Sequence, residues 1–349
     1  MKMRNCLWMG LLLTLGGCQN PPPARQKLSP DPPEGSAAAE PVTLPVEPTS
    51  KNFAMTPPVI EAAPPVPAAP TAIPAKDPGC ADTPTAAEAA KMYPWSRRAA
   101  SYESWCARFP APAGYTRVPA VKDSYAWWLR HLPALAAGTP VKDYTGTTLL
   151  SATVISVAVI DLDVGTQDLQ QCMDTIIRLR GEYHWYRDSA DSVKFRYAGG
   201  LYYGFFDWRQ GLRPEKVGGR IQLVARATAA GGRKSFEKYL RFMYAMTGTA
   251  HNTQELPVTA ATLAPGDFFI EPSPSPRQLG HALIVLDVAR DARGGLSAII
   301  AQGYTPARDL HLLKSPDGSA WFTLDPAGAN SFPTWGNPFS WTQVMRFRH

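Results

Sequence analysis

The chain has 349 residues, and 35 Lys and Arg against 29 Asp and Glu give it a formal net charge of +6 at pH 7. The excess is small and unclustered, and no basic stripe is interleaved with aromatic residues, so the composition argues against a nucleic-acid partner. The six histidines are dispersed along the sequence. Because metal sites need ligands at short spacing, we expect neither a metal nor a cofactor.

The N-terminus has the pattern of a secretory signal peptide. Two basic residues precede an apolar run from Leu7 to Leu15, which is too short for a permanent membrane span. Small residues then lead to Cys18, and this pattern resembles the lipobox of bacterial lipoproteins. The resemblance implies that residues 1–17 are removed and that Cys18 is lipidated, so that membrane lipid is a partner of the mature chain. Gln19 after that cysteine favours the periplasmic face of the outer membrane over the inner membrane.

A Pro- and Ala-rich segment follows the lipidation site. Seventeen of the 35 prolines lie between Pro21 and Pro78. Such a composition lacks the large apolar residues that would offset ordering entropy, so we expect residues 18–88 to carry the anchor and a disordered, semi-stiff tether. Aromatic residues become frequent from Tyr93 onward, which predicts one globular domain over 89–349 and a monomer.

The five cysteines separate into groups. Cys6 leaves with the signal peptide and Cys18 carries lipid, whereas Cys80 and Cys106 can form a disulfide in an oxidising compartment. Cys172 is then the unpaired thiol. A bridge from Cys172 to Cys80 or Cys106 is the alternative.

The first half of the domain reads mainly as helix. Residues 124–135 predict a helix, and the apolar, β-branched run 152–162 predicts a buried strand. Gly165 to Asp168 offers turn and cap residues for a helix that continues to Trp185, with Cys172 in its first turns on the inward face. Aromatic and glycine residues from Phe195 to Trp208 predict a hairpin near the site.

The C-terminal third reads as strands. Residues 235–246 predict one more helix, after which five strand-like segments follow: 267–270, 281–288, 296–302, 310–313 and 321–324. Helices followed by antiparallel strands predict an α+β fold with segregated layers.

The order of these elements resembles the papain-like fold of NlpC-type cell-wall peptidases and amidases. The matching residues are Pro265-Gly266-Asp267 before a strand, and Gly280-His281 at the head of the next strand. The resemblance implies a catalytic Cys172 and His281, with Gln302 holding the imidazole, on a helix packed against an antiparallel sheet. The family's usual Asp-Cys-Ser-Gly is absent, because this chain has Gln-Cys-Met-Asp at 171–174.

A longer resemblance, from about Gly114 to the C-terminus, is to an uncharacterised bacterial family, domain of unknown function 4846. It is carried by the sequences at 161–165, 168–172, 177–183, 208–211 and 280–282. This family implies no activity, so the chemistry has to come from the residues.

A cysteine and a histidine provide the nucleophile and the proton carrier of acyl transfer. Backbone N–H groups at the start of a helix favour a thiolate, so the sequence predicts a lowered pKa for Cys172. Gln167 and Gln170 are candidate donors to an oxyanion. The alternative for Cys172 is a small buried core residue without reactivity.

Two functions from different classes follow. The first is a lipid-anchored cysteine peptidase or amidase, a thiol hydrolase of the cell envelope that acts on peptidoglycan or another peptide or amide substrate. The second is a non-catalytic envelope lipoprotein that uses the same cleft to bind a cell-wall glycan, a peptide or a protein partner.

Overall fold

Two long neighbouring strands form the centre of the fold. In the computed structural model, which describes residues 78–349 except 81, 97–101, 198, 274–278 and 334–335, β9 (His281–Asp291) pairs antiparallel with β10 (Leu296–Gln302). A bulge lies between Ile299 and Ile300, so the register shifts by one residue there. His281 is the first residue of β9 and Gln302 is the last residue of β10. Because the strands are antiparallel, these two residues lie at the same end of the strand pair.

The other strands extend this pair into a mixed-length antiparallel sheet. Within the described residues it contains nine strands in the order β2-β11-β10-β9-β8-β13-β7, while β1 pairs with the far end of β9 and β12 with the first half of β10. The further strands are β1 (Tyr115–Arg117), β2 (Ser156–Val159), β7 (Leu256–Pro257), β8 (Phe268–Glu271), β11 (His311–Leu313), β12 (Trp321–Leu324) and β13 (Val344–Arg346).

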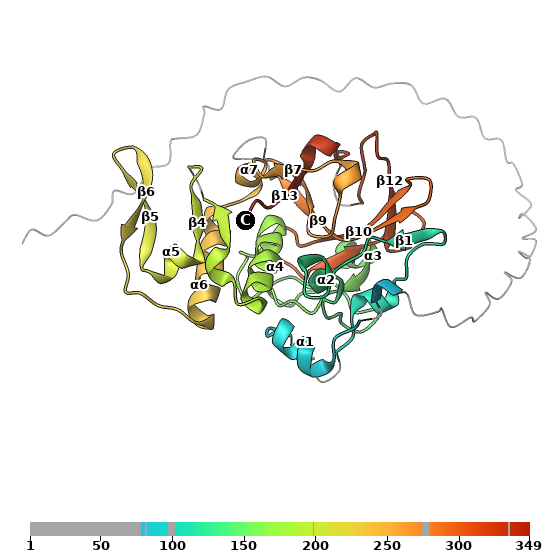
Figure 1. Cartoon of the computed structure of the whole chain (residues 1–349), viewed down its shortest axis with the longest axis horizontal. Coiled ribbons are helices and arrows are strands. Elements are labelled where there is room, and N and C mark those ends of the chain that lie inside the picture. Colours follow the sequence, from blue (N-terminus) through green and yellow to red (C-terminus); the bar gives the residue numbers. More distant parts are fainter. Residues whose placement is uncertain (1–77, 81, 97–101, 198, 274–278, 334–335) are drawn as a thin grey trace, which may run out of the picture. The chain divides into compact units, whose positions relative to one another are not determined.

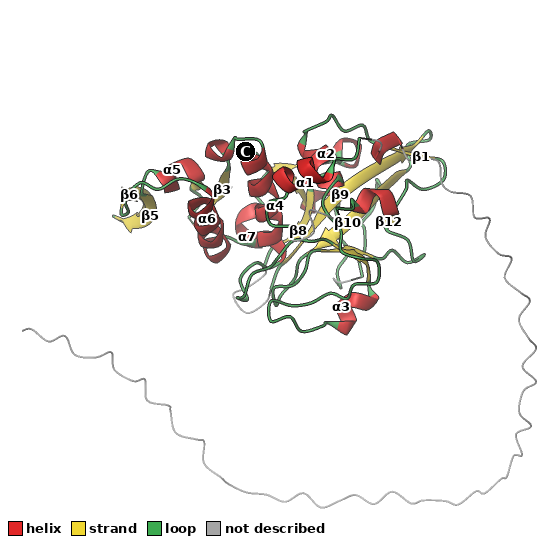
Figure 2. Cartoon of the chain, turned by 90° about the horizontal axis from the view of Figure 1, so that it is seen from below, coloured by secondary structure: helices red, strands yellow, loops and turns green. Residues whose placement is uncertain are grey.

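Helices and two small hairpins make up the rest. The helices are α1 (Ala86–Met92), α2 (Tyr125–Arg130), α3 (Leu150–Val154), α4 (Cys172–Tyr186), α5 (Phe205–Arg209), α6 (Arg233–Met246) and α7 (Thr249–Asn252). Short 3₁₀ turns lie at Pro78–Cys80, Trp105–Arg108, Ala190–Ser192, Ala260–Thr262 and Trp341–Gln343. The hairpins pair β3 (Lys194–Arg196) with β4 (Tyr202–Gly204), and β5 (Leu212–Val217) with β6 (Arg220–Ala225). Figure 1 and Figure 2 show this arrangement, in which β5 and β6 lie far from the large sheet.

Both faces of the large sheet are buried. Ile284 and Leu286 of β9 belong to the core that the sheet shares with α1, α2, α4 and α6. The alternate residues Leu283 and Val285 face a second core, which includes Phe332 and Phe339 from the C-terminal segment. Because successive residues of a strand point to opposite faces, β9 needs an unbroken apolar run rather than an alternating one. The fold is therefore α+β, as the order of predicted elements indicates.

A buried ion cluster attaches α2 and β1 to β9. The carboxylate of Asp287 accepts hydrogen bonds from Arg130, whose Nη2 lies 2.6 Å from Oδ1, and also pairs with the guanidinium of Arg117. All three side chains are at most 2% exposed. Such a cluster is stable because two guanidinium groups and hydrogen bonds compensate the desolvation of one carboxylate.

The described chain begins with a segment that packs on this core. Cys80 and Cys106 form a disulfide with their Cα atoms 6.0 Å apart, and Met92 of α1 is buried. All described residues fall in one compact unit, so ordered chain precedes residue 89, where the sequence predicts the start of the domain. The predicted signal peptide, Cys18 and nearly all of the predicted tether lie outside the described residues. Among the helices that the structure describes, none has the length and apolarity of a membrane span.

Three predicted elements differ from the structure. The predicted strand 152–162 is helical at its start. Strand β11 pairs only with residues 156–159, so the residues before them have no neighbouring strand in β11. The Thr153 hydroxyl donates instead to the Leu149 carbonyl oxygen at 2.8 Å, within the helix. The helix predicted over 124–135 ends at Arg130. Pro133 explains this early end, because a proline disfavours helical backbone in the residue before it. Likewise, the hairpin predicted to run to Trp208 stops at Gly204.

Candidate functional site

Cys172 is the first residue of α4. The turn and cap residues Gly165 to Asp168 predict a helix that begins at Leu169, so α4 starts three residues later than predicted. The Asp168 carboxylate is occupied elsewhere, since it accepts hydrogen bonds from the Ala307 backbone at 2.7 Å and from the Gln171 side chain at 3.0 Å. Asp174 caps the helix instead, by accepting the Gln171 backbone N–H at 3.1 Å. The thiol therefore lies at the very N-terminus of α4.

Two competing effects act on the Cys172 thiol. It is the free cysteine among the described residues and is only 8% exposed. Burial raises its pKa to about 11, and the nearby Asp174 carboxylate adds to this, while backbone N–H groups of Ala282, Met173 and Cys172 itself lower it. The lowered pKa that the sequence predicts is therefore wrong for this geometry, because desolvation of the thiolate outweighs the helix-terminal N–H groups.

His281 is the first residue of β9 and is joined to the last residue of β10. Its Nε2 lies 2.8 Å from Oε1 of Gln302, and the Gln302 Nε2 lies 3.1 Å from Nε2 of His311. The Nδ1 of His311 in turn lies 2.8 Å from the carbonyl oxygen of Asp309. These four groups form one buried chain of hydrogen bonds, of which the sequence predicts only the first link.

The direction of this chain fixes the protons. The Asp309 carbonyl can only accept, so the His311 proton is on Nδ1 and its Nε2 accepts from the Gln302 amide. Gln302 therefore presents its oxygen to His281, whose proton must be on Nε2. The Nδ1 of His281 then carries a lone pair, which is the form that acts as a base.

The start of α4 approaches the ends of β9 and β10 closely. A Cβ atom on Gly303 would come within 2.4 Å of the Thr175 hydroxyl and 3.1 Å of the Gln171 carbonyl oxygen, so only glycine permits this contact. On the neighbouring strand β9, the backbone N–H of Ala282, the residue after His281, is near enough to Cys172 to lower the pKa of its thiol. The structure thus brings Cys172, His281 and Gln302 into one region.

Two residues that the sequence does not single out lie over this region. The ring centroid of Tyr304 is 4.8 Å from that of His281, and the Arg308 guanidinium lies 4.7 Å from the Tyr304 centroid. The neighbouring Thr305 hydroxyl donates to the Gln171 side chain at 2.9 Å. No local sequence signal identifies Tyr304 or Arg308, because the loop after β10 brings them to the site.

The two glutamines considered as oxyanion donors interact elsewhere. Gln167 accepts a hydrogen bond from Arg241, and Gln170 accepts one from Arg178 at 2.8 Å. Both side chains are thereby held toward α6 and the middle of α4 instead of toward the Cys172 thiol. Gln170 therefore lines a different pocket, and Gln167 is joined to that pocket through Arg241.

The thiol and the two imidazoles are uncharged around pH 7. Burial lowers the pKa of His281 to about 4, although the hydrogen bond to Gln302 opposes this, and burial also lowers the pKa of His311 to about 4. Around pH 7 the two groups are therefore an uncharged thiol and an uncharged imidazole. Within the described part of the chain, no group of three or more His, Cys, Asp or Glu residues could hold a metal ion.

One family model matches the chain. It is described as a domain of unknown function (4846) and covers residues 106–346, more than half of the sequence. Neither the curated proteins nor the solved structures contain a match.

Proposed function

The chain belongs to the domain of unknown function 4846 family, which implies no activity, and from the geometry of its site we propose that it is a cysteine peptidase or amidase of the cell envelope. The observation that carries the proposal is the hydrogen bond between His281 Nε2 and Gln302 Oε1, next to a free thiol at a helix start. Peptide or amide bonds of peptidoglycan are the proposed substrate. The proposal includes a papain-like core, which the order helix-cysteine, strand-histidine, strand-glutamine favours.

The proposed reaction is acyl transfer in two steps. The Cys172 sulfur attacks the carbonyl carbon of the scissile amide while its proton moves to His281, and a C–S bond forms. The imidazolium gives the proton to the amide nitrogen, the C–N bond breaks and the amine leaves. Water then attacks the thioester and loses a proton to His281, which returns it to the sulfur as the C–S bond breaks and the acid leaves.

Gln302 has a positioning role in this reaction. Its amide cannot rotate by half a turn without facing its NH₂ toward the His281 Nε2–H and its oxygen toward the acceptor nitrogen of His311. This restraint keeps the His281 lone pair on Nδ1, the nitrogen that has to take the thiol proton. The backbone N–H groups in the first turn of α4 lack helical acceptors and are the proposed oxyanion donors.

The proposed location follows from the N-terminal sequence. Lipid on Cys18 would anchor the protein to the outer membrane at its periplasmic face, and the segment up to residue 77 would let the domain reach the cell wall. A residue spacing of about 3.1 Å in an extended polyproline conformation allows a reach on the order of 180 Å at most.

A second candidate function is non-catalytic binding of a cell-wall glycan, a peptide or a protein partner. The observation that favours it is the burial of Cys172, whose thiol has its pKa raised to about 11. A thiol of that kind is typical of a core residue, and the hydrogen bonds around His281 would then serve only stability.

Digestion of purified peptidoglycan separates the two functions. The full-length protein in detergent is incubated with sacculi, and released fragments are followed by liquid chromatography and mass spectrometry. We expect new fragments from the wild type and from His251→Ala, a histidine on α7, and none from Cys172→Ala or His281→Ala. Cosedimentation with sacculi measures binding by the same variants.

The outcomes are distinct. Fragments that persist with Cys172→Ala overturn the enzyme proposal, as does a folded wild type that binds sacculi without releasing any fragment. The latter result supports the binding function. Circular dichroism of each variant shows whether a loss of fragments reflects chemistry or unfolding.

A further inference from the structure

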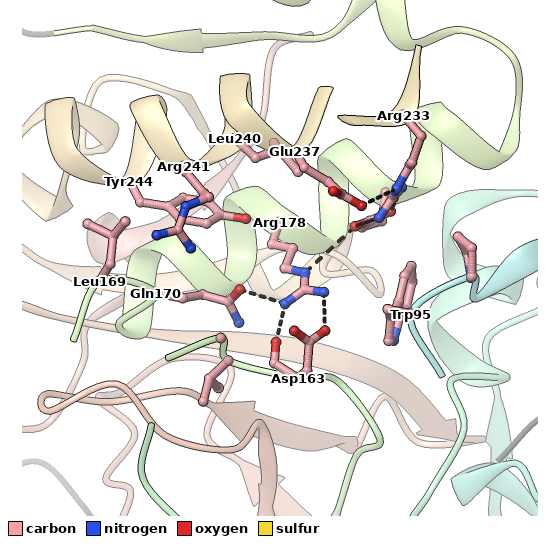
Figure 3. A pocket seen from close by; sticks show the side chains of 14 residues that line it. Trp95, Asp163, Leu169, Gln170, Arg178, Arg233, Glu237, Leu240, Arg241 and Tyr244 are labelled. Carbon is pink, nitrogen blue, oxygen red and sulfur yellow. Dashed lines mark hydrogen bonds and ion pairs between the residues drawn. The ribbon is translucent and has the colours of Figure 1, made fainter. Parts of the chain in front are cut away.

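A separate pocket of about 370 Å³ lies between α4, α6 and the loop before α4. Figure 3 shows Arg178 at its centre, with Asp163 below its guanidinium group, Gln170 to the left and residues of α6 above. Trp95 closes one side, and its indole N–H is already bonded to the Asp161 carbonyl oxygen at 2.9 Å. The size is that of a site for a small ligand. Cys172 and His281 are not among its lining residues.

Most charged groups of this pocket form one network. Arg178 pairs with Asp163 at 2.7 Å, and Arg233 pairs with Glu182 at 2.5 Å and with Glu237 at 2.8 Å. Among the residues that the structure describes, three carboxylates of this network thus share two guanidinium groups. The Glu237 side chain is 51% exposed, so its pair with Arg233 is weak and can exchange for another cation.

The remaining cation of the pocket has a neutral partner. Arg241 lies one helical turn beyond Glu237 on α6, and its side chain donates to the Gln167 amide oxygen, not to a carboxylate. Residues four apart on a helix are neighbours on its surface. The pocket therefore has a positive end at Arg241 and a negative end at Glu237.

A buried amide donor lies in the same wall. The Nε2 of Gln170 has no hydrogen-bond acceptor among the described residues, and this side chain is 4% exposed. Its orientation is fixed because Oε1 accepts from Arg178. A buried donor left without an acceptor is destabilising, and a carboxylate or carbonyl oxygen of a ligand would accept its hydrogen bond. The apolar side chains of Val164, Leu169 and Leu240 complete the wall.

We propose that this pocket binds a small zwitterion of the amino acid or short peptide class. The carboxylate of the ligand binds at Arg241 and its ammonium group at Glu237, while its apolar part contacts the wall formed by Val164, Leu169, Leu240 and Trp95. The site is independent of the thiol chemistry, because no lining residue takes part in the proposed reaction. Binding is therefore expected to survive Cys172→Ala, even if the protein proves not to be an enzyme.

Calorimetric titration of the full-length protein with dialanine tests this proposal. Three further probes separate the contributions: N-acetyl-dialanine lacks the ammonium group, dialanine amide lacks the carboxylate, and N-acetylglucosamine lacks both. We expect dialanine to bind and each of the other three to bind at least tenfold more weakly. Equal binding of the blocked dipeptides, preference for the sugar, or no binding of dialanine at millimolar concentration would overturn the proposal.

Variants assign the binding to this pocket. Arg241→Gln is expected to weaken dialanine about tenfold while leaving the affinity for dialanine amide unchanged, and Glu237→Gln is expected to weaken dialanine but not its N-acetyl form. Lys238→Gln, on the same helix but outside the pocket, serves as the matched control. Because all three residues are exposed, their replacement should leave the melting temperature unchanged. Equal effects of Lys238→Gln and Arg241→Gln would contradict the proposed site.

Discussion

The imidazole of His281 donates from Nε2 to the side-chain oxygen of Gln302 at 2.8 Å, across the paired ends of β9 and β10. Since His311 holds the other side of that amide, the hydrogen-bond order determines which nitrogen of His281 has the lone pair. In the proposed reaction, Gln302 therefore acts only by holding the His281 imidazole in one tautomer.

Replacing Gln302 is predicted to release this restraint. In Gln302→Leu we expect His281 to populate both neutral tautomers. Peptidoglycan turnover should then fall roughly tenfold or more, because only one tautomer has the lone pair on Nδ1 that takes the thiol proton. Nitrogen-15 NMR of the imidazole reports the tautomer directly. Gln302→Glu keeps an acceptor for His281 but cannot donate to His311, so it should preserve the His281 tautomer better than Leu does. A single His281 tautomer in Gln302→Leu would contradict the role of this hydrogen-bond chain.

The thiol is predicted to label slowly at neutral pH. Because burial raises the pKa of Cys172 to about 11, the rate of alkylation by iodoacetamide should increase about tenfold per pH unit from pH 7 to 9. A rate that is already constant at pH 7 would show an activated thiolate instead.

Asp174 is predicted to contribute to that slow labelling. Burial raises the pKa of Asp174 to about 8, and its carboxylate raises the pKa of Cys172. Asp174→Asn should therefore accelerate alkylation, most clearly above pH 8, where the wild-type carboxylate becomes ionised. Asp191→Asn, near the end of α4 remote from the thiol, is the control and should follow the wild-type profile.

Acid is predicted to destabilise the domain through buried histidines. Burial lowers the pKa of His131 to about 4 from an ordinary value of 6.5. The folded state therefore binds fewer protons than the unfolded state below pH 6.5, so stability is present above that pH and is lost as the pH falls toward 4. In urea titrations, His131→Gln should flatten this decline, whereas the exposed His349→Gln should not. An unchanged slope in His131→Gln would be inconsistent with burial of a neutral imidazole.

The buried cluster of Asp287 is predicted to be critical for stability. Asp287→Asn removes the buried carboxylate that pairs with both Arg117 and Arg130, which should lower the free energy of unfolding by about 3–5 kcal/mol. The exposed pair of Glu215 and Arg226 on the β5–β6 hairpin provides the comparison. Glu215→Gln should cost no more than about 1 kcal/mol in the same denaturation experiment. Equal losses in the two variants would argue against the cluster.

The sequence by itself determined the fold class and most of the C-terminal strands. The predicted strand 296–302 is confirmed residue for residue as β10, and the strand beginning at His281 is confirmed as β9, because an unbroken apolar run next to turn residues has few alternatives. The start of α4 and the helical turn at 150–154 could not be predicted in this way. They depend on partners distant in the chain, such as the Ala307 N–H for Asp168 and the short strand β11.

Only the tertiary structure decided the chemistry around the thiol. The sequence weighs helix-terminal N–H groups near Cys172, but burial cannot be read from a residue's neighbours in the chain, and it reverses the expected direction of the pKa. In the same way, Gln170 lies two residues before Cys172, yet its side chain bonds to Arg178. His311 is far from Cys172 in the sequence, yet it joins the hydrogen-bond chain of His281 through Gln302. Helix and strand geometry turns consecutive side chains toward different neighbours, so sequence proximity does not determine which groups share a site.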